Sequence, residues 1–175
     1  MTELLHAWAI APAAIGACCL AADRGRARWS DAVASAIMLI AMLDAATTRL
    51  VAPVYWAALL LVSAMALAAW QRPRRNDGRA ASAQGTMTVH TGLGLVAMAA
   101  LQLGMAHPSV GAIAATAHGH GGGGGTLLAV LLMGGAVAYA ALSALLVFRA
   151  HRALDRAQLI CMGASVLLMA VGASV

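Results

Sequence analysis

Charged residues are scarce in this chain of 175 residues, and lysine is absent altogether. Only 10% of the residues are charged, against about 25% in an ordinary soluble domain. Hydrophobic residues make up 62% of the chain, which is more apolar surface than one soluble core of this size can bury. The composition therefore excludes an ordinary soluble domain and predicts a protein whose outer surface is covered by lipid.

Cysteine and the familiar catalytic motifs are also sparse. The three cysteines, Cys18, Cys19 and Cys161, each lie in an apolar stretch, and the adjacent pair does not make a CxxC redox motif. The chain has no HExxH motif, no GxSxG motif and no phosphate-binding loop. The sequence therefore predicts neither a disulfide framework nor an enzyme.

Long apolar stretches dominate what is present. A helix needs about 20 apolar residues to cross about 30 Å of hydrocarbon. Six stretches come near this length, and they cover residues 4–22, 30–46, 54–70, 88–106, 126–148 and 159–175. The sequence therefore predicts an all-α fold, a polytopic bundle of six transmembrane helices that forms a single domain over residues 1–175.

The eleven arginines are distributed unevenly between the connectors. Ten of them follow the first, third or fifth stretch, and only Arg49 follows the second. Because short loops rich in arginine stay in the cytoplasm, this asymmetry predicts a cytoplasmic loop at residues 71–87. It also predicts that the N-terminus and the C-terminus are both non-cytoplasmic.

This topology explains the positive net charge of the chain. The net charge is +5, and the positive residues lie in short connectors where they orient helices, so nucleic acid is not an expected partner. The expected partners are the lipid bilayer and other membrane proteins or further copies of the chain. Arginine without lysine, with abundant alanine, glycine and valine, indicates a bacterial genome rich in GC. The expected location is therefore the bacterial inner (cell) membrane.

Side chains suited to metal binding fall near the predicted outer ends of the second and fourth helices. Thioether sulfur is a soft ligand that suits Cu(I), and imidazole suits copper and zinc. The predicted outer loop, residues 107–125, contains a His-Gly-His sequence followed by five glycines, which make it adaptable. The candidate ligands of a copper or zinc site are Met42, Asp44, Met105, His107, His118 and His120.

Other roles compete with the metal interpretation. Methionine is an ordinary filler of apolar interiors. Asp44 lies near enough to the interface to reach headgroups or to pair with Arg49. For His118 and His120 the alternative to metal contact is a mobile polar loop. At the inner end, Asp31 lies one turn from Arg28 and is expected to form an interfacial ion pair. His90 also lies near the inner end, far from the candidate ligands.

The middle thirds of the helices offer few polar side chains to line a transport pathway, chiefly Ser63, Gln102 and Ser143.

Two of the predicted helices carry spaced Asp, His and Met residues. Their patterns are Asp31-x6-Met38-x3-Met42 and His90-x7-Met98-x6-Met105. These patterns resemble an uncharacterised actinobacterial family of small multi-pass membrane proteins, a domain of unknown function with His/Met-patterned helices and a His-rich outer loop. The equivalent of the second helix begins with His in that family, where this sequence has Asp31. The resemblance implies the architecture and an affinity for metal, but no reaction.

Three functions follow from these patterns. The first is a non-enzymatic integral membrane protein that packs against other membrane proteins as an accessory or assembly subunit, because abundant small residues let transmembrane helices approach closely. The alternative is copper or zinc handling at the outer membrane face, which implies copper as a cofactor. The second alternative is a small-solute transporter, based on a repeated spacing between the second and fourth helices.

Overall fold

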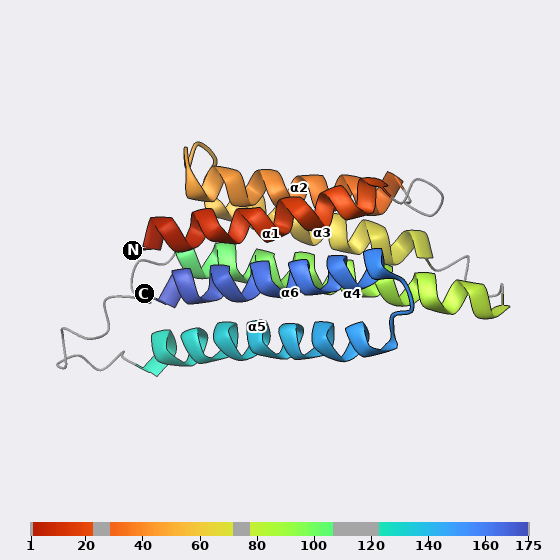
Figure 1. Cartoon of the computed structure of the whole chain (residues 1–175). Coiled ribbons are helices and arrows are strands. Elements are labelled where there is room, and N and C mark those ends of the chain that lie inside the picture. The colour runs from red at the N-terminus through yellow and green to blue at the C-terminus, as the bar shows by residue number, and fades with distance from the viewer. Residues whose placement is uncertain (1, 23–28, 72–77, 107–122, 175) are drawn as a thin grey trace.

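A computed structural model describes residues 2–22, 29–71, 78–106 and 123–174 of the protein. This part of the chain forms six α-helices and contains no strand. The helices are α1 (Thr2–Ala22), α2 (Trp29–Ala46), α3 (Pro53–Gln71), α4 (Gly78–Ala106), α5 (Gly123–Arg149) and α6 (Ala153–Ser174). They run side by side along one axis (Figure 1). The predicted all-α fold of six helices is confirmed.

The helices α2 to α6 are each long and apolar enough to cross a membrane. Their apolar spans have a mean hydropathy between 1.3 and 2.2. In α1 the part whose side chains the structure describes includes the apolar segment Trp8–Cys19. Large apolar side chains such as Val62, Met65 and Val130 are exposed on the outside of the bundle, where lipid would solvate them. The fold is that of an integral membrane protein.

The helices extend beyond the predicted apolar stretches where polar residues continue them. The predicted loop 71–87 is shortened because α4 begins at Gly78, and Figure 1 shows its first turns projecting beyond the other helices. Alanine, arginine and glutamine there have high helix propensities, although they are not part of an apolar stretch. Similarly, α6 begins at Ala153, with Asp155 in its first turn, where a negative charge stabilises a helix.

Both termini lie at the same end of the bundle, and α1, α3 and α5 all end at the other (Figure 1). The second end carries Arg149 at the end of α5, Arg152 in the connection to α6, and Arg156 near the start of α6. We call it the arginine end. The assignment of this end to the cytoplasm remains a prediction, since it depends on the distribution of arginine alone.

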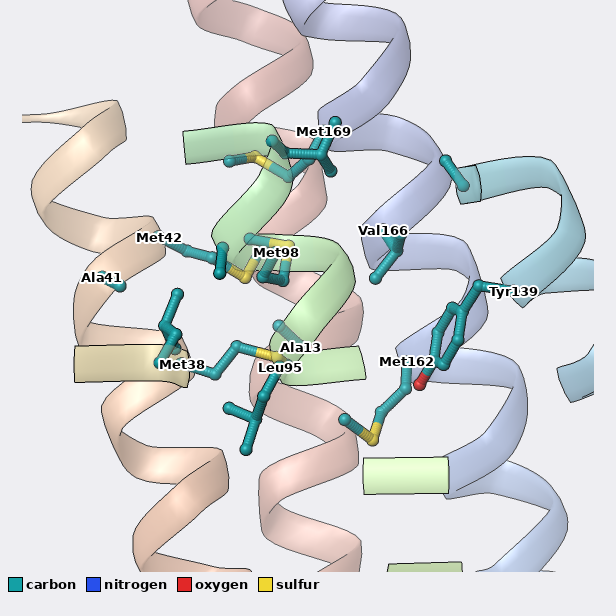
Figure 2. Packing of buried hydrophobic residues seen from close by; sticks show 14 of the residues in the cluster. Ala13, Met38, Ala41, Met42, Leu95, Met98, Tyr139, Met162, Val166 and Met169 are labelled. Atoms are coloured by element: carbon teal, nitrogen blue, oxygen red, sulfur yellow. The ribbon is translucent and has the colours of Figure 1, made fainter. Parts of the chain in front are cut away.

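Methionine contributes many of the buried side chains of the core. Five methionines, from α2, α4 and α6, are at most 3% exposed, and Figure 2 shows them projecting into one cluster: Met38, Met42, Met98, Met162 and Met169. Thioether side chains are flexible and fill irregular gaps between helices. The structure thus shows a packing role for these five residues.

Candidate functional site

The residues predicted to bind metal are only partly within the described chain. Met42 is fully buried in the core, and Met105 is partly buried against it. His107, His118 and His120 lie outside the described residues. In the ranges that the structure describes, no group of three or more His, Cys, Asp or Glu residues is placed to hold a metal ion. The metal site on the outer face stays a prediction.

Asp44, in the last turn of α2, organises the connection to α3. Its Oδ1 accepts hydrogen bonds from the Thr48 hydroxyl at 2.7 Å and the Leu50 amide at 3.0 Å. Its Oδ2 accepts from the Val51 amide at 3.2 Å and from Trp56 Nε1 at 2.8 Å. Each carboxylate oxygen thus has two donors, and hydrogen bonds to a charged acceptor are the stronger kind. The carboxylate has a structural use that does not require a metal.

Arg49 reverses the chain direction after α2. Its φ of 48° is left-handed, a conformation that costs an ordinary residue about 1–2 kcal/mol. Its amide donates to the Asp44 carbonyl oxygen at 2.7 Å, and its Nε donates to the Ala45 carbonyl oxygen at 3.4 Å. Arg49 is therefore connected to Asp44 through the backbone, and together these hydrogen bonds hold the strained turn.

A buried polar cluster, which sequence analysis did not identify, lies between α4 and α5. His90, Tyr139 and Ser143 are at most 5% exposed. His90 Nε2 lies 2.8 Å from Ser143 Oγ, and the Tyr139 hydroxyl lies 3.3 Å from His90 Nδ1. The two rings are stacked, with centroids 4.8 Å apart. We call these three residues the His90 cluster.

One arrangement of protons satisfies the whole His90 cluster. The Ser143 hydroxyl has a single proton, which it donates to the Tyr139 carbonyl oxygen at 2.9 Å. In that arrangement it accepts from His90 Nε2, and Nδ1 of the neutral imidazole accepts from the Tyr139 hydroxyl. In the opposite tautomer Ser143 donates to Nε2, Nδ1 donates to the Tyr139 hydroxyl, and that hydroxyl donates to the His90 carbonyl oxygen at 3.4 Å. A neutral, fully paired histidine is the form that costs least inside a membrane.

Two glycines make room for the His90 cluster. A Cβ atom on Gly94 would lie 2.7 Å from the Tyr139 hydroxyl oxygen and 3.4 Å from Met162 Cε. A Cβ atom on Gly163, in α6, would lie 3.1 Å from Ser143 Cβ and 3.2 Å from its Oγ. A side chain at Gly94 would therefore have to displace the Tyr139 hydroxyl, and one at Gly163 would be tight against Ser143, so α4, α5 and α6 pack closely at this level of the bundle.

Further polar contacts join α2 to α4. Asp31, 8% exposed, accepts a hydrogen bond from Thr88 Oγ1 at 3.3 Å. Gln102 Nε2 donates to the Ala41 carbonyl oxygen at 3.4 Å. Asp31 is buried against α4, and its expected ion pair with Arg28 stays a prediction, because Arg28 lies outside the described residues. These buried polar side chains thus connect helices within the bundle.

Next to the His90 cluster, a groove with a volume of about 370 Å³ runs between α4 and α5. Its walls are apolar side chains of both helices, and the Tyr139 side chain contributes to its lining. We call it the α4/α5 groove. It differs from the cluster beside it because it is lined almost entirely by hydrocarbon.

Comparison with protein-family models, curated proteins and solved structures found no match for this chain. The fold and the buried contacts define its class, a polytopic α-helical membrane protein. The resemblance to the actinobacterial family remains a prediction from the spacing of His, Asp and Met residues.

Proposed function

We propose that this protein is a non-enzymatic accessory or assembly subunit that packs α5 against a transmembrane helix of another membrane protein. Among the five apolar spans, that of α5 is the least covered by the rest of the chain. In Leu127–Arg149, 17% of the span is buried, against 56% in Gly85–Met105 of α4. A helix so weakly covered has most of its surface available to a neighbour in the membrane.

A regular seam of exposed residues runs along α5. Its members follow one another at alternating intervals of four and three residues: Val130, Gly134, Val137, Ala141, Ala144 and Phe148. Alternating steps of four and three residues make a repeat of seven, and its period of 3.5 residues is the one at which two long helices keep facing each other. Small residues in such a seam allow the two backbones to approach closely. We call these six residues the α5 seam.

The observation that carries the proposal is the open space at Gly134. A Cβ atom there would meet nothing within 4 Å, so, unlike Gly94, this glycine is not needed for packing inside the chain. The fold explains Gly94, because a neighbouring side chain lies against it, but it does not explain Gly134 in this way. Gly92 and Gly135 are equally open, and Gly134 is the one of these three that lies in the α5 seam. Docking of a partner helix on the α5 seam would supply an explanation.

Photo-crosslinking in native membranes tests this proposal. A photoreactive residue at Val137, in the α5 seam, is compared with one at Val62 on α3, because the two side chains are similarly exposed, 55% and 62%. We expect a discrete protein adduct from position 137 only, and its loss in Gly134→Phe. Mass spectrometry of the adduct identifies another protein or a second copy of this chain. Equal adducts at both positions, or an adduct unaffected by Gly134→Phe, would contradict the proposal.

Metal analysis separates this proposal from copper or zinc handling. Protein purified in detergent is loaded with either metal and compared with a variant in which His107, His118 and His120 are replaced by alanine. The accessory role predicts no stoichiometric metal in either sample. Metal bound by the wild type and lost from the variant would support the metal site instead, because imidazole is the expected ligand.

A further inference from the structure

The α4/α5 groove is a hydrocarbon surface that opens toward the membrane. Leu93 and Val96 of α4 and Leu131 of α5 line it and are exposed, whereas Ala136 and Tyr139 line it and are buried. Within a bilayer an unfilled apolar groove loses dispersion contacts along its walls, and water finds too few polar partners there. Hydrocarbon chains are the chemistry that fits these walls.

An arginine lies in line with the groove. Gly135 and Leu142 line the groove on α5, and Arg149 follows Leu142 by seven residues. Since seven residues are about two helical turns, the three lie on one face of the helix. Arg149 is exposed and lies about 10 Å beyond Leu142 at about 1.5 Å per residue. Arg149 therefore lies on the same face of α5 as these two groove residues, beyond the end of the groove at Leu142.

The surroundings of Arg149 are positive overall. Arg152 and Arg156 are exposed at the same end of the bundle, and Asp155 is the single acidic residue between positions 149 and 156. Arginine is the side chain best suited to a phosphate group, because its planar fork can donate two hydrogen bonds to the phosphate oxygens. The charge at this end of the groove is complementary to an anionic headgroup.

The groove lies within reach of a lipid whose phosphate is at Arg149. On α5 it extends from Leu142, about 10 Å from Arg149 along the helix, to Leu131, about 27 Å away. Fourteen residues separate Arg149 from Gly135, which corresponds to about 21 Å along α5. One leaflet consists of about 15 Å of hydrocarbon and about 5–7 Å of headgroup region. A lipid with its phosphate at Arg149 would therefore have its chain end near Gly135.

From these three observations we propose that the α4/α5 groove binds an acyl chain of an anionic phospholipid, whose phosphate is held by Arg149. The lipid lies in the leaflet at the arginine end and covers the side of α5 that adjoins α4. The proposal is independent of the accessory role, because the α5 seam and the residues of α5 that line the groove share no member.

Native mass spectrometry of the full chain, released from detergent with added lipid, tests this proposal. The probes are phosphatidylglycerol and phosphatidylcholine with identical chains. We expect phosphatidylglycerol adducts to predominate in the wild type and to fall about fivefold in Arg149→Gln, the effect of removing one arginine near an anionic surface. Arg49→Gln, which removes the same charge at the opposite end of the bundle, is the matched control and should change little. Glycerophosphoglycerol, which has the headgroup but no chains, should not compete.

A second pair of variants tests the position of the chain. Ala138 and Ala141 are both exposed on α5, but only Ala138 lines the groove. Ala138→Phe should reduce the adducts of both lipids, and Ala141→Phe should not. Equal binding of the two lipids, equal effects of Arg149→Gln and Arg49→Gln, displacement by the chain-free headgroup, or a polypeptide bound in place of lipid would each overturn the proposal.

Discussion

The two sides of α5 differ in what they contact. The inward side presents Tyr139 and Ser143, which are buried and lie within hydrogen-bonding distance of His90. Tyr139 packs against Gly94, and Ser143 packs against Gly163. The outward side presents the α5 seam, where the position of Gly134 has open space. The comparison teaches that a glycine in this bundle either receives a neighbour within the fold, as Gly94 does, or has open space beside it, as Gly134 does.

The largest effect on stability is expected at Gly94, because the Tyr139 hydroxyl already lies against it. In Gly94→Leu the new side chain would overlap the Tyr139 hydroxyl and displace it from His90. Overpacking of this kind should lower the free energy of unfolding by about 3 kcal/mol. Gly92→Leu is the matched control, because a Cβ atom on Gly92, in the same helix, meets nothing within 4 Å. Thermal unfolding in detergent measures both, and equal stability of the two variants would show that the inward contact is not tight.

A smaller effect on stability is expected from the hydrogen bond between His90 of α4 and Ser143 of α5. His90→Leu and Ser143→Ala each remove one partner of the 2.8 Å contact, and the double variant removes both. The coupling energy from this double-mutant cycle should be about 1 kcal/mol, within the range found for hydrogen bonds between transmembrane helices. Additive effects of the two single substitutions would mean that the histidine and the serine act independently.

The His90 cluster also shows what the sequence could and could not reveal. The apolar stretches and the uneven distribution of arginine predicted six helices, because the thickness of hydrocarbon sets helix length directly. The partners of His90 lie 49 and 53 residues away along the chain, and which faces of α4 and α5 meet depends on tertiary packing. The spacing of residues within one helix does not tell which residues of another helix pack against it.

The metal candidates illustrate the same limit at the other end of the bundle. Asp44 and Met42 are close in sequence, which made them plausible ligands at one depth. The structure directs Met42 into the core and surrounds the Asp44 carboxylate with donors from the turn and from Trp56. Depth in the membrane can be estimated from the sequence, but the direction of a side chain around its helix cannot.

A local effect is expected when Asp44 is changed. Asp44→Asn removes the negative charge and places an amide nitrogen against one of the pairs of donors, so the turn after α2 should open while the bundle remains folded. Hydrogen–deuterium exchange should become faster at the amides of Leu50 and Val51 and stay unchanged in α4. Thr48→Val, which removes one of the four donors, should give a weaker change at the same amides. Unaltered exchange in Asp44→Asn would mean that the turn is held by its backbone alone.

The smallest effect on stability is expected on the outward side of α5. Gly134→Leu should change the free energy of unfolding in detergent by less than about 0.5 kcal/mol, as for surface substitutions elsewhere, because its side chain enters open space. The same substitution in native membranes should remove the protein adduct formed through Val137, since a partner backbone can no longer approach. If Gly134→Leu is stable alone but fails to associate, the glycine serves contact with a partner outside the chain. Loss of stability in Gly94→Leu would show that the other glycine serves packing within the chain. If Gly134→Leu destabilised the isolated chain as strongly as Gly94→Leu, the two sides of α5 would not differ in the way that the structure indicates.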